Sequence, residues 1–234
     1  MWRVAFICGL YYYSLNNKFE KPTYVLSVDE KTGIQALEPT VADKPSLPGH
    51  DLKREYEYIR HGTTCLTAGR DVVSGKIIHY TLRANRKEKD FLDFIRQTVK
   101  KLPKEADIIF VADQLNTHKS ESLVKWIAKE VNYKGALGKK NYKGILKDQQ
   151  SRKQFLENQT HRIRFAYTPK HCSWVNQIEC WFSILNRHII KHGNFSSVKE
   201  LKHGIVNYID YYNRCLAKPF NWRYKGQLLN YLKT

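Results

Sequence analysis

The sequence predicts one α/β domain in which a mixed β-sheet is flanked by α-helices. Two observations lead to this prediction. Short apolar runs rich in β-branched residues, typical of buried strands, occur at Tyr24–Val28, Ile108–Ala112 and Arg162–Tyr167. Between and after them, apolar residues recur at helical spacing, and such an order of strands and helices forms a sheet covered by helices. A chain of 234 residues is long enough to bury the core of one such domain.

The first part of the chain is expected to contain a helix, a strand and a hairpin. Residues 1–21 read as a helical segment that ends in the polar stretch Asn16–Lys21, before the first strand. Residues 33–52 contain three prolines, which are too many for regular structure, so we expect an extended segment there. A hairpin with strands at Thr63–Ala68 and Lys76–Leu82 follows.

Helical spacing of apolar residues marks the remaining elements. Ser173 is a plausible N-cap of the third expected helix, and Gly193 is a plausible residue just beyond its end. The four helices are expected at Asp90–Val99, Ser120–Val131, Trp174–Lys191 and Ser197–Tyr212.

A basic segment interrupts this pattern. Asn132–Lys153 carries seven basic residues and one acid, and its motif Asn-Tyr-Lys-Gly at 132–135 recurs at 141–144. Two copies are too few for a repeat protein. A basic, tyrosine-containing insertion can hold a phosphate backbone and stack on bases. A solvated loop without a specific role is an equally good interpretation.

The charge balance points to a polyanionic partner. Lys and Arg total 40 against 22 acidic residues, which gives a formal charge of +18. Such a field attracts nucleic acid or an anionic membrane, although a merely basic surface would have the same composition. The five cysteines are odd in number and follow no framework, as in a reducing cytoplasm. The apolar segment Val4–Tyr13 is too short to span a bilayer and lacks a cleavage site, so we expect no membrane partner.

Three carboxylates are candidates for metal binding. Asp29 and Asp113 each follow a short apolar run, where a side chain lies at the rim of a sheet, and Glu179 lies on a partly apolar helix face. Mg²⁺ prefers oxygen ligands and is usually held by a few carboxylates. A boundary Glu paired with a lysine is the alternative for Glu179. A zinc site is disfavoured by spacing, because structural zinc sites pair their cysteines two to four residues apart, unlike the set Cys172, Cys180, His188 and His192.

Three ordered blocks carry a resemblance to a known family. They are Asp29–Ala36, Asp113–His118, and Tyr167–Asn176 followed by Glu179, with Arg60–Gly69 between the first two. Together they resemble the catalytic blocks of IS630 family transposases, in the IS630/Tc1/mariner superfamily. The resemblance extends from about residue 24 to about residue 225.

This resemblance implies an RNase H-like fold with a catalytic and metal-binding Asp-Asp-Glu set, here Asp29, Asp113 and Glu179. It implies two Mg²⁺ or Mn²⁺ ions, DNA strand cleavage by water, and strand transfer by the freed 3′-hydroxyl. The partners would be double-stranded DNA and a second copy of the chain, in a bacterial cytoplasm at the nucleoid. Residues 22–234 would form the catalytic domain with a basic insertion at about 132–160, and residues 1–21 a residual helical or linker segment.

The same blocks suggest supporting residues. His118 would contact the scissile phosphate or a metal-bound water, or it is a loop histidine bonded locally. We expect Trp174 to fix the helix that carries Glu179 by packing, and Asn176 to do so by hydrogen bonding. Further DNA contacts are expected from Lys170 and His171 beside the third acid, and from Lys139, Lys140 and Lys143 in the insertion.

Three departures from the family pattern matter. Asp113 and Glu179 are 66 positions apart, more than in compact relatives, and Gln114 stands where many relatives carry Asn. The 21 residues before the first strand region cannot hold a helix-turn-helix reader, so the chain resembles a catalytic domain that is truncated, started internally, or split from a separate helix-turn-helix polypeptide. An RNase H-like endonuclease that cuts without joining, and a catalytically silent DNA-binding remnant, remain alternatives.

Overall fold

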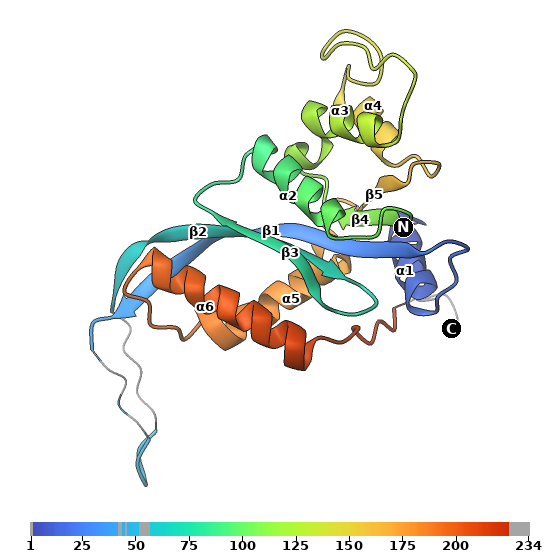
Figure 1. Cartoon of the computed structure of the whole chain (residues 1–234). Helices are drawn as coiled ribbons and strands as arrows, with labels where there is room; N and C mark the ends of the chain where they lie inside the picture. Colours follow the sequence, from blue (N-terminus) through green and yellow to red (C-terminus); the bar gives the residue numbers. More distant parts are fainter. Residues whose placement is uncertain (1, 42–43, 45, 52–56, 225–234) are drawn as a thin grey trace, which may run out of the picture.

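A five-stranded mixed sheet forms the centre of the molecule, with the strand order β3-β2-β1-β4-β5. The computed structural model describes residues 2–41, 44, 46–51 and 57–224 (Figure 1). Antiparallel pairing joins β1 to β2 and β2 to β3, whereas β4 pairs parallel with β1 and β5 parallel with β4. The predicted mixed sheet is confirmed. Its strands are β1 (Thr23–Pro39), β2 (Tyr58–Asp71), β3 (Ile77–Arg83), β4 (Asp107–Ala112) and β5 (Ile163–Tyr167).

Helices cover both faces of the sheet, because successive side chains of a strand point to opposite sides. On β4, Ile108 and Phe110 pack into the core under α2 (Glu88–Lys100), α3 (Glu121–Glu130) and α4 (Gln149–Leu156). Ile109 and Val111 point the other way and pack with α1 (Trp2–Leu15). The helices α5 (Gln177–Leu185) and α6 (Val198–Tyr211) lie on the same side as α1 (Figure 1).

The N-terminal helix is part of this domain. Val4, Ile7 and Tyr11 of α1 are buried against residues of β1, β4 and β5. The expected helix is therefore present, and it covers one face of the sheet in addition to leading into β1. No helix among the described residues has the length and apolar character needed to cross a membrane.

Two strands are longer than predicted. β1 continues to Pro39 because β2 pairs with it as far as Tyr58, with an irregularity in register beside Gly33, whose φ is +65°. Residues 33–39 of the segment expected to be irregular therefore belong to the sheet. β2 continues through Arg70 to Asp71, and the hairpin turn lies at residues 72–75.

The predicted helix Trp174–Lys191 starts in the wrong place. Ser173–Val175 form a 3₁₀ turn, and α5 begins at Gln177 with Asn176, not Ser173, in the N-cap position. The helix then ends in a π-turn at Asn186–Ile190. Asn176 has an extended backbone, with φ −81° and ψ 108°, so the chain cannot continue as one helix through it.

The basic insertion ends in a helix that the sequence pattern did not indicate. The Asp148 side chain caps α4 by accepting a hydrogen bond from the backbone N–H of Ser151 at 2.7 Å. Phe155 and Leu156 of this helix enter the core. The end of the insertion is thus fixed to the domain, whereas its middle is exposed.

Candidate active site

Strand register brings Asp29 and Asp113 together. The parallel pairing of β1 and β4 ends with Ser27 opposite Val111, and each acid follows two residues later. Asp113 comes directly after the last residue of β4, as expected. Asp29 does not end its strand, because β1 runs on to Pro39, but it lies where β4 stops. One ligand atom each of Asp29, Asp113 and His118 lie within 4.8 Å of one another.

Glu179 lies in the first turn of α5 and is partly buried. Its charge contributes to raising the pKa of Asp29, so the two carboxylates are electrostatic neighbours. It does not belong to the tight group formed by Asp29, Asp113 and His118. The structure therefore places two of the predicted acids close together, with the third near enough to act on the pKa of Asp29.

The pKa of Asp29 shows how unfavourable this pair is without a cation. Asp29 is 7% exposed, and its pKa is raised to about 8, first by burial and then by the charge of Asp113. A backbone N–H bond from Glu30 at 2.8 Å only partly opposes this rise. Near neutral pH, a proton on Asp29 thus reduces the repulsion between the two carboxylates, as a bound cation would do.

His118 lies beneath the acids and forms ion pairs on both sides of its ring. Its Nδ1 lies 2.7 Å from Oδ1 of Asp113, and its Nε2 lies 3.1 Å from Oε2 of Glu30. The imidazole is fully buried and contacts the ring of Phe91, with centroids 4.0 Å apart. The hydroxyl of Tyr167 donates to the His118 carbonyl at 2.6 Å. The histidine is therefore held firmly in one orientation.

These contacts determine the protonation of His118. Burial lowers its pKa, but Asp113 and Glu30 outweigh burial and raise the pKa to about 9. Burial would raise the pKa of Asp113, yet the bond and charge of His118 bring it below its ordinary value. His118 offers a ring nitrogen close to the ligand atoms of both aspartates, but in this structure both of its ring nitrogens are paired with carboxylates. The buried ring thus matches the alternative of a locally bonded loop histidine, and a contact with the scissile phosphate or a metal-bound water stays a prediction.

Glu30 is a residue of this site that the sequence analysis missed. Its side chain is 3% exposed and faces His118, on the opposite side of β1 from Asp29. The only available signal was a second acid directly after Asp29.

Asn176 bonds directly to the acidic site, whereas Trp174 does not anchor the segment. The Nδ2 of Asn176 donates to the Val28 carbonyl at 3.1 Å and to Oδ2 of Asp29 at 3.2 Å. Trp174 is 51% exposed and meets the ring of Tyr224 edge-on. The buried apolar residue of this 3₁₀ turn is Val175, so the packing expected of Trp174 is supplied by its neighbour.

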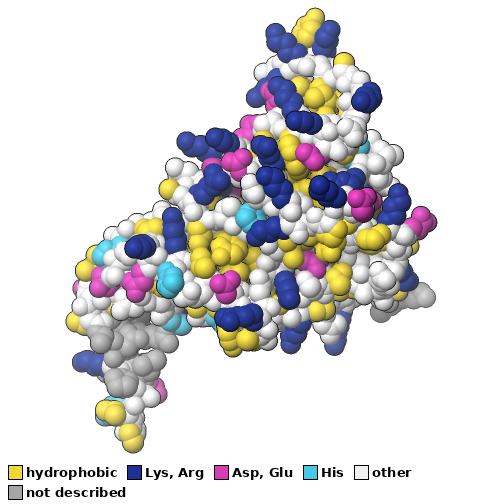
Figure 2. Space-filling model, in the orientation of Figure 1, with side chains coloured by type: hydrophobic (Ala, Val, Ile, Leu, Met, Phe, Trp, Pro, Cys, Tyr) yellow, Lys and Arg dark blue, Asp and Glu magenta, His cyan; other side chains and the backbone are white. Residues whose placement is uncertain are grey.

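The expected DNA-contacting side chains lie on the surface. Lys170 and His171 are exposed in the loop that leads from β5 to the 3₁₀ turn. Lys139, Lys140 and Lys143 are exposed in the insertion, where a backbone bridge joins residues 139 and 143. Figure 2 shows Lys and Arg side chains spread over the part of the molecule formed by α3, α4 and the loop between them.

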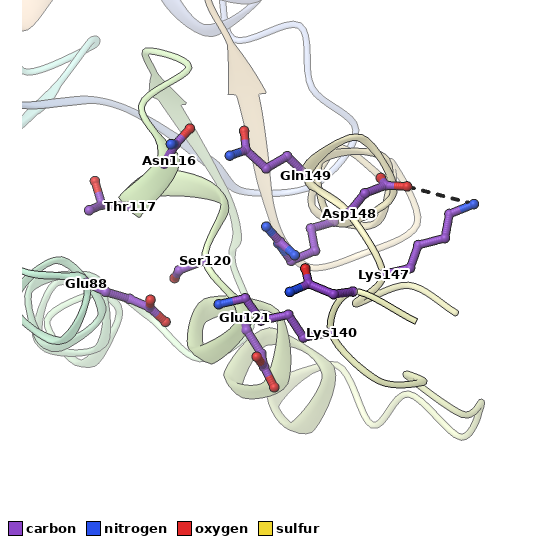
Figure 3. A pocket seen from close by; sticks show the side chains of 11 residues that line it. Glu88, Asn116, Thr117, Ser120, Glu121, Lys140, Lys147, Asp148 and Gln149 are labelled. Atoms are coloured by element: carbon purple, nitrogen blue, oxygen red, sulfur yellow. Dashed lines mark ion pairs between the residues drawn. The ribbon is translucent and has the colours of Figure 1, made fainter. Parts of the chain in front are cut away.

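A cavity of about 490 Å³ separates the insertion from the loop that follows Asp113. Asn116, Thr117 and Ser120 line it on one side, and Lys140 and Lys147 on the other (Figure 3). Its charged side chains have both signs, since the basic residues face Glu88, Glu121 and Asp148. None of the three predicted acids lines this cavity, so it adjoins the acidic site without being part of it.

Comparison with known proteins places this arrangement in a family. The sequence model of a DDE superfamily endonuclease domain matches residues 24–202. No curated protein matches the chain. Among solved structures, the Mos1 mariner paired-end complex with Mn has a TM-score of 0.55 at 15% identity, covering 94% of this chain and 56% of that chain. The catalytic domain of Mos1 mariner transposase has a TM-score of 0.52 at 12% identity, covering 94% of this chain and 84% of that one.

These likenesses establish the fold. The five-stranded sheet and its helices match the RNase H-like catalytic domain of a DDE transposase. The chain spans about half the length of the Mos1 chains in the paired-end complexes, 56% in each of two structures.

Proposed function

This chain belongs to the DDE superfamily endonuclease family, and from that membership we propose that it is a DNA transposase catalytic domain of the IS630 type. In this proposal it cleaves DNA strands and joins the freed 3′-hydroxyl to target DNA. The observation that carries the proposal is the convergence of Asp29 and Asp113 at the point where β4 ends, with Glu179 as an electrostatic neighbour.

Asp29, Asp113 and Glu179 would hold Mg²⁺ or Mn²⁺, with two ions as our proposal. Their carboxylate oxygens are the ligands that these ions prefer, and the raised pKa of Asp29 indicates a site short of positive charge. Two such ions, when bound, activate an attacking oxygen and stabilise a leaving oxygen in an in-line phosphoryl displacement.

The surrounding residues keep the carboxylates in place. His118 holds Asp113 from one side while Glu30 holds the far nitrogen of the same ring. Asn176 donates to Asp29 and so fixes the rotamer of that carboxylate. Partners of metal ligands of this kind typically change metal affinity or activity by about 10–100-fold when they are removed.

DNA would bind mainly through charge. The net charge of +18 and the exposed lysines of the insertion provide phosphate contacts, and Lys170 and His171 lie in the loop before α5. The comparison structures include a Mos1 paired-end complex with the left transposon end. By analogy we propose transposon-end and target DNA as partners, a homodimer on DNA, a separate helix-turn-helix polypeptide as the end reader, and a nucleoid location in a bacterial cytoplasm.

A strand-transfer assay tests the proposal. The chain is incubated with Mn²⁺, a supercoiled plasmid and a labelled oligonucleotide that has a pre-cut 3′-hydroxyl end. We expect plasmid nicking and covalent joining of the label to the plasmid, both abolished in Asp113→Asn. Nicking without joining would favour an endonuclease, and DNA binding without either reaction would favour a silent remnant.

A further inference from the structure

Two buried polar residues outside the acidic cluster attach the first turn of α5 to the sheet. They are Ser27 of β1 and Arg70 of β2, which lie opposite each other in the antiparallel pairing of these strands. Both are 0% exposed. Buried polar and charged side chains are usually bonded, so their partners indicate what they hold in place.

Ser27 caps α5 from a neighbouring strand. Its Oγ accepts a hydrogen bond from the backbone N–H of Ile178 at 2.8 Å and donates to Oδ1 of Asn176. Asn176 occupies the N-cap position, yet its side chain forms no bond to its own helix. The first N–H groups of a helix need such an acceptor, and here Ser27 supplies it in place of Asn176. The amide of Asn176 is thereby free to reach Asp29.

Arg70 holds the next residue of the same turn. Its Nη1 donates to Oε1 of Gln177 at 2.6 Å, and its Nη2 donates to the Lys218 carbonyl at 2.8 Å. The guanidinium carbon lies 3.8 Å from the centre of the Phe220 ring. Arg70 therefore ties α5 to both the sheet and the C-terminal segment.

Arg70 is a costly residue at this place. Within the described part of the chain, its guanidinium belongs to no ion pair, and burial lowers the pKa of Arg70. A buried charge without a carboxylate partner is unfavourable, and an apolar residue of similar volume often fills such a place at lower cost. A contribution to folding stability therefore does not explain the presence of an arginine at position 70.

We propose that Ser27 and Arg70 are positioning residues for Glu179. Together they fix Asn176, Gln177 and Ile178, the three residues directly before it. This inference rests on the proposed function, in which Glu179 completes the acidic site. A side chain in the first turn of a helix moves with the anchoring of that turn, and misplacing a reacting group by 1 Å can cost about a hundredfold in rate.

The test compares Ser27→Ala, Arg70→Met, Gln177→Met, the double variant Arg70→Met/Gln177→Met, and the conservative Gln177→Glu. The matched control is Arg164→Met, which removes a guanidinium bonded to Asp107 and His161 at the opposite end of the sheet. Three quantities are measured on each protein: Mn²⁺ affinity by electron paramagnetic resonance, amide hydrogen exchange in the first turn of α5, and the Tm.

We expect Ser27→Ala, Arg70→Met and Gln177→Met each to weaken Mn²⁺ binding by about 10–100-fold. Amide exchange at Ile178 and Glu179 should become faster, while the Tm falls no further than in Arg164→Met. The double variant should resemble either of its single variants, because the two residues act through one bond. Gln177→Glu keeps an acceptor for Arg70 and should retain the affinity of the parent.

Parental Mn²⁺ affinity and exchange in Arg70→Met and Gln177→Met would overturn the inference. So would a lowered Tm with unchanged Mn²⁺ affinity of the folded protein, since Arg70 would then serve stability alone. If the parent protein itself binds no Mn²⁺, the proposed function fails. The amide exchange rates then still test whether Ser27 and Arg70 anchor the first turn of α5. Faster exchange at Ile178 and Glu179 then supports it, and unchanged exchange overturns it.

Discussion

The carboxylates of Asp29 and Asp113 lie beside each other because each follows by two residues the last pair in the parallel register of β1 and β4, Ser27 and Val111. At this point β4 stops, whereas β1 runs on. Strand residues therefore precede and follow Asp29 in the sequence. Asp113, in contrast, is the first residue of a loop, and its side chain is 39% exposed. The more rigid acid is also the more buried one, and its pKa is raised to about 8 by burial and by Asp113. The two carboxylates repel each other, and a bound cation would reduce this repulsion.

Asp29→Asn should abolish strand cleavage while stabilising the ion-free protein. The amide oxygen can accept from only one of the two donors, Asn176 and the Glu30 N–H, but the substitution removes the buried charge that conflicts with Asp113. We expect at least about a thousandfold loss of nicking rate, as for the removal of a group central to catalysis. The Tm in EDTA at pH 9 should rise by about 2–4 °C for each kcal/mol of repulsion removed. A variant that nicks plasmid at the parental rate would contradict the assignment.

The ion-free protein should lose stability as the pH rises from 7 to 9. Folded Asp29 keeps its proton up to about pH 8, whereas the unfolded carboxyl releases it near 3.8. Folded His118 keeps its extra proton up to about pH 9, against 6.5 when unfolded. In both intervals the folded state binds more protons than the unfolded state, so the free energy of unfolding falls with rising pH. The stabilisation from His118 is complete below pH 6.5 and is lost toward pH 9.

Urea unfolding in EDTA at pH 5, 7 and 9 measures this dependence. Asp29→Asn should flatten the slope, and added Mn²⁺ should restore more stability at pH 9 than at pH 5. The interval from pH 7 to pH 9 is decisive, because burial lowers the pKa of His79 and His161 from 6.5, and their contribution to stability therefore rises with pH below that value, against the trend of Asp29. A free energy of unfolding that increases from pH 7 to pH 9 would show that Asp29 and His118 are not perturbed as described.

The sequence was sufficient to predict that Asp29 and Asp113 lie close together, but not which residues contact them. The apolar runs before Asp29 and Asp113 predicted strands, and strands in one sheet bring such residues to a common edge. Glu30 could not be recognised, because its role depends on His118, which lies 88 positions away. Arg70 falls between the two expected hairpin strands, Thr63–Ala68 and Lys76–Leu82, and only its pairing with Ser27 shows that it lies in a strand.

The start of α5 shows the same limit. Ser173 followed by an apolar, helix-like pattern is a normal N-terminal signal, yet the helix begins at Gln177. The deciding contact is between Asn176 and Ser27, which are 149 positions apart. The helix α4 escaped prediction for a different reason, because it has only eight residues in a polar segment. Its stability comes from burying Phe155 and Leu156 rather than from local pattern.

Glu30→Gln should lower the pKa of His118 and slow DNA cleavage. The substitution removes one of the two anions that hold the imidazolium and leaves Asp113 as the other. We expect about 10–100-fold lower activity, because Asp113 loses part of its support. An NMR titration of His118 measures the pKa directly. His61, whose partner Glu38 is far more exposed than Glu30, serves as the internal reference. An unchanged His118 titration would mean that Glu30 has no influence on the ring.

The lysines of the insertion should contribute to DNA affinity in proportion to their charge. Lys139, Lys140 and Lys143 are exposed in a segment that leaves the domain after α3 and rejoins it at α4, beside the loop that follows Asp113. Replacing all three with Ala should weaken duplex binding and reduce the slope of log K against log salt by up to about three, one for each lost phosphate contact. Mn²⁺ binding should be unaffected.

The control for this triple variant removes three exposed lysines at the opposite edge of the sheet: Lys21, Lys100 and Lys104. Lys21 and Lys104 precede β1 and β4, so they lie at the ends of these strands that are far from the acids. Both variants lose the same net charge, and a purely global electrostatic effect would weaken DNA binding equally in the two. A larger loss in the insertion variant, measured by fluorescence anisotropy between 50 and about 200 mM salt, would locate the DNA path beside the insertion. Equal losses would show that the insertion is a solvated loop whose lysines add only to the overall charge.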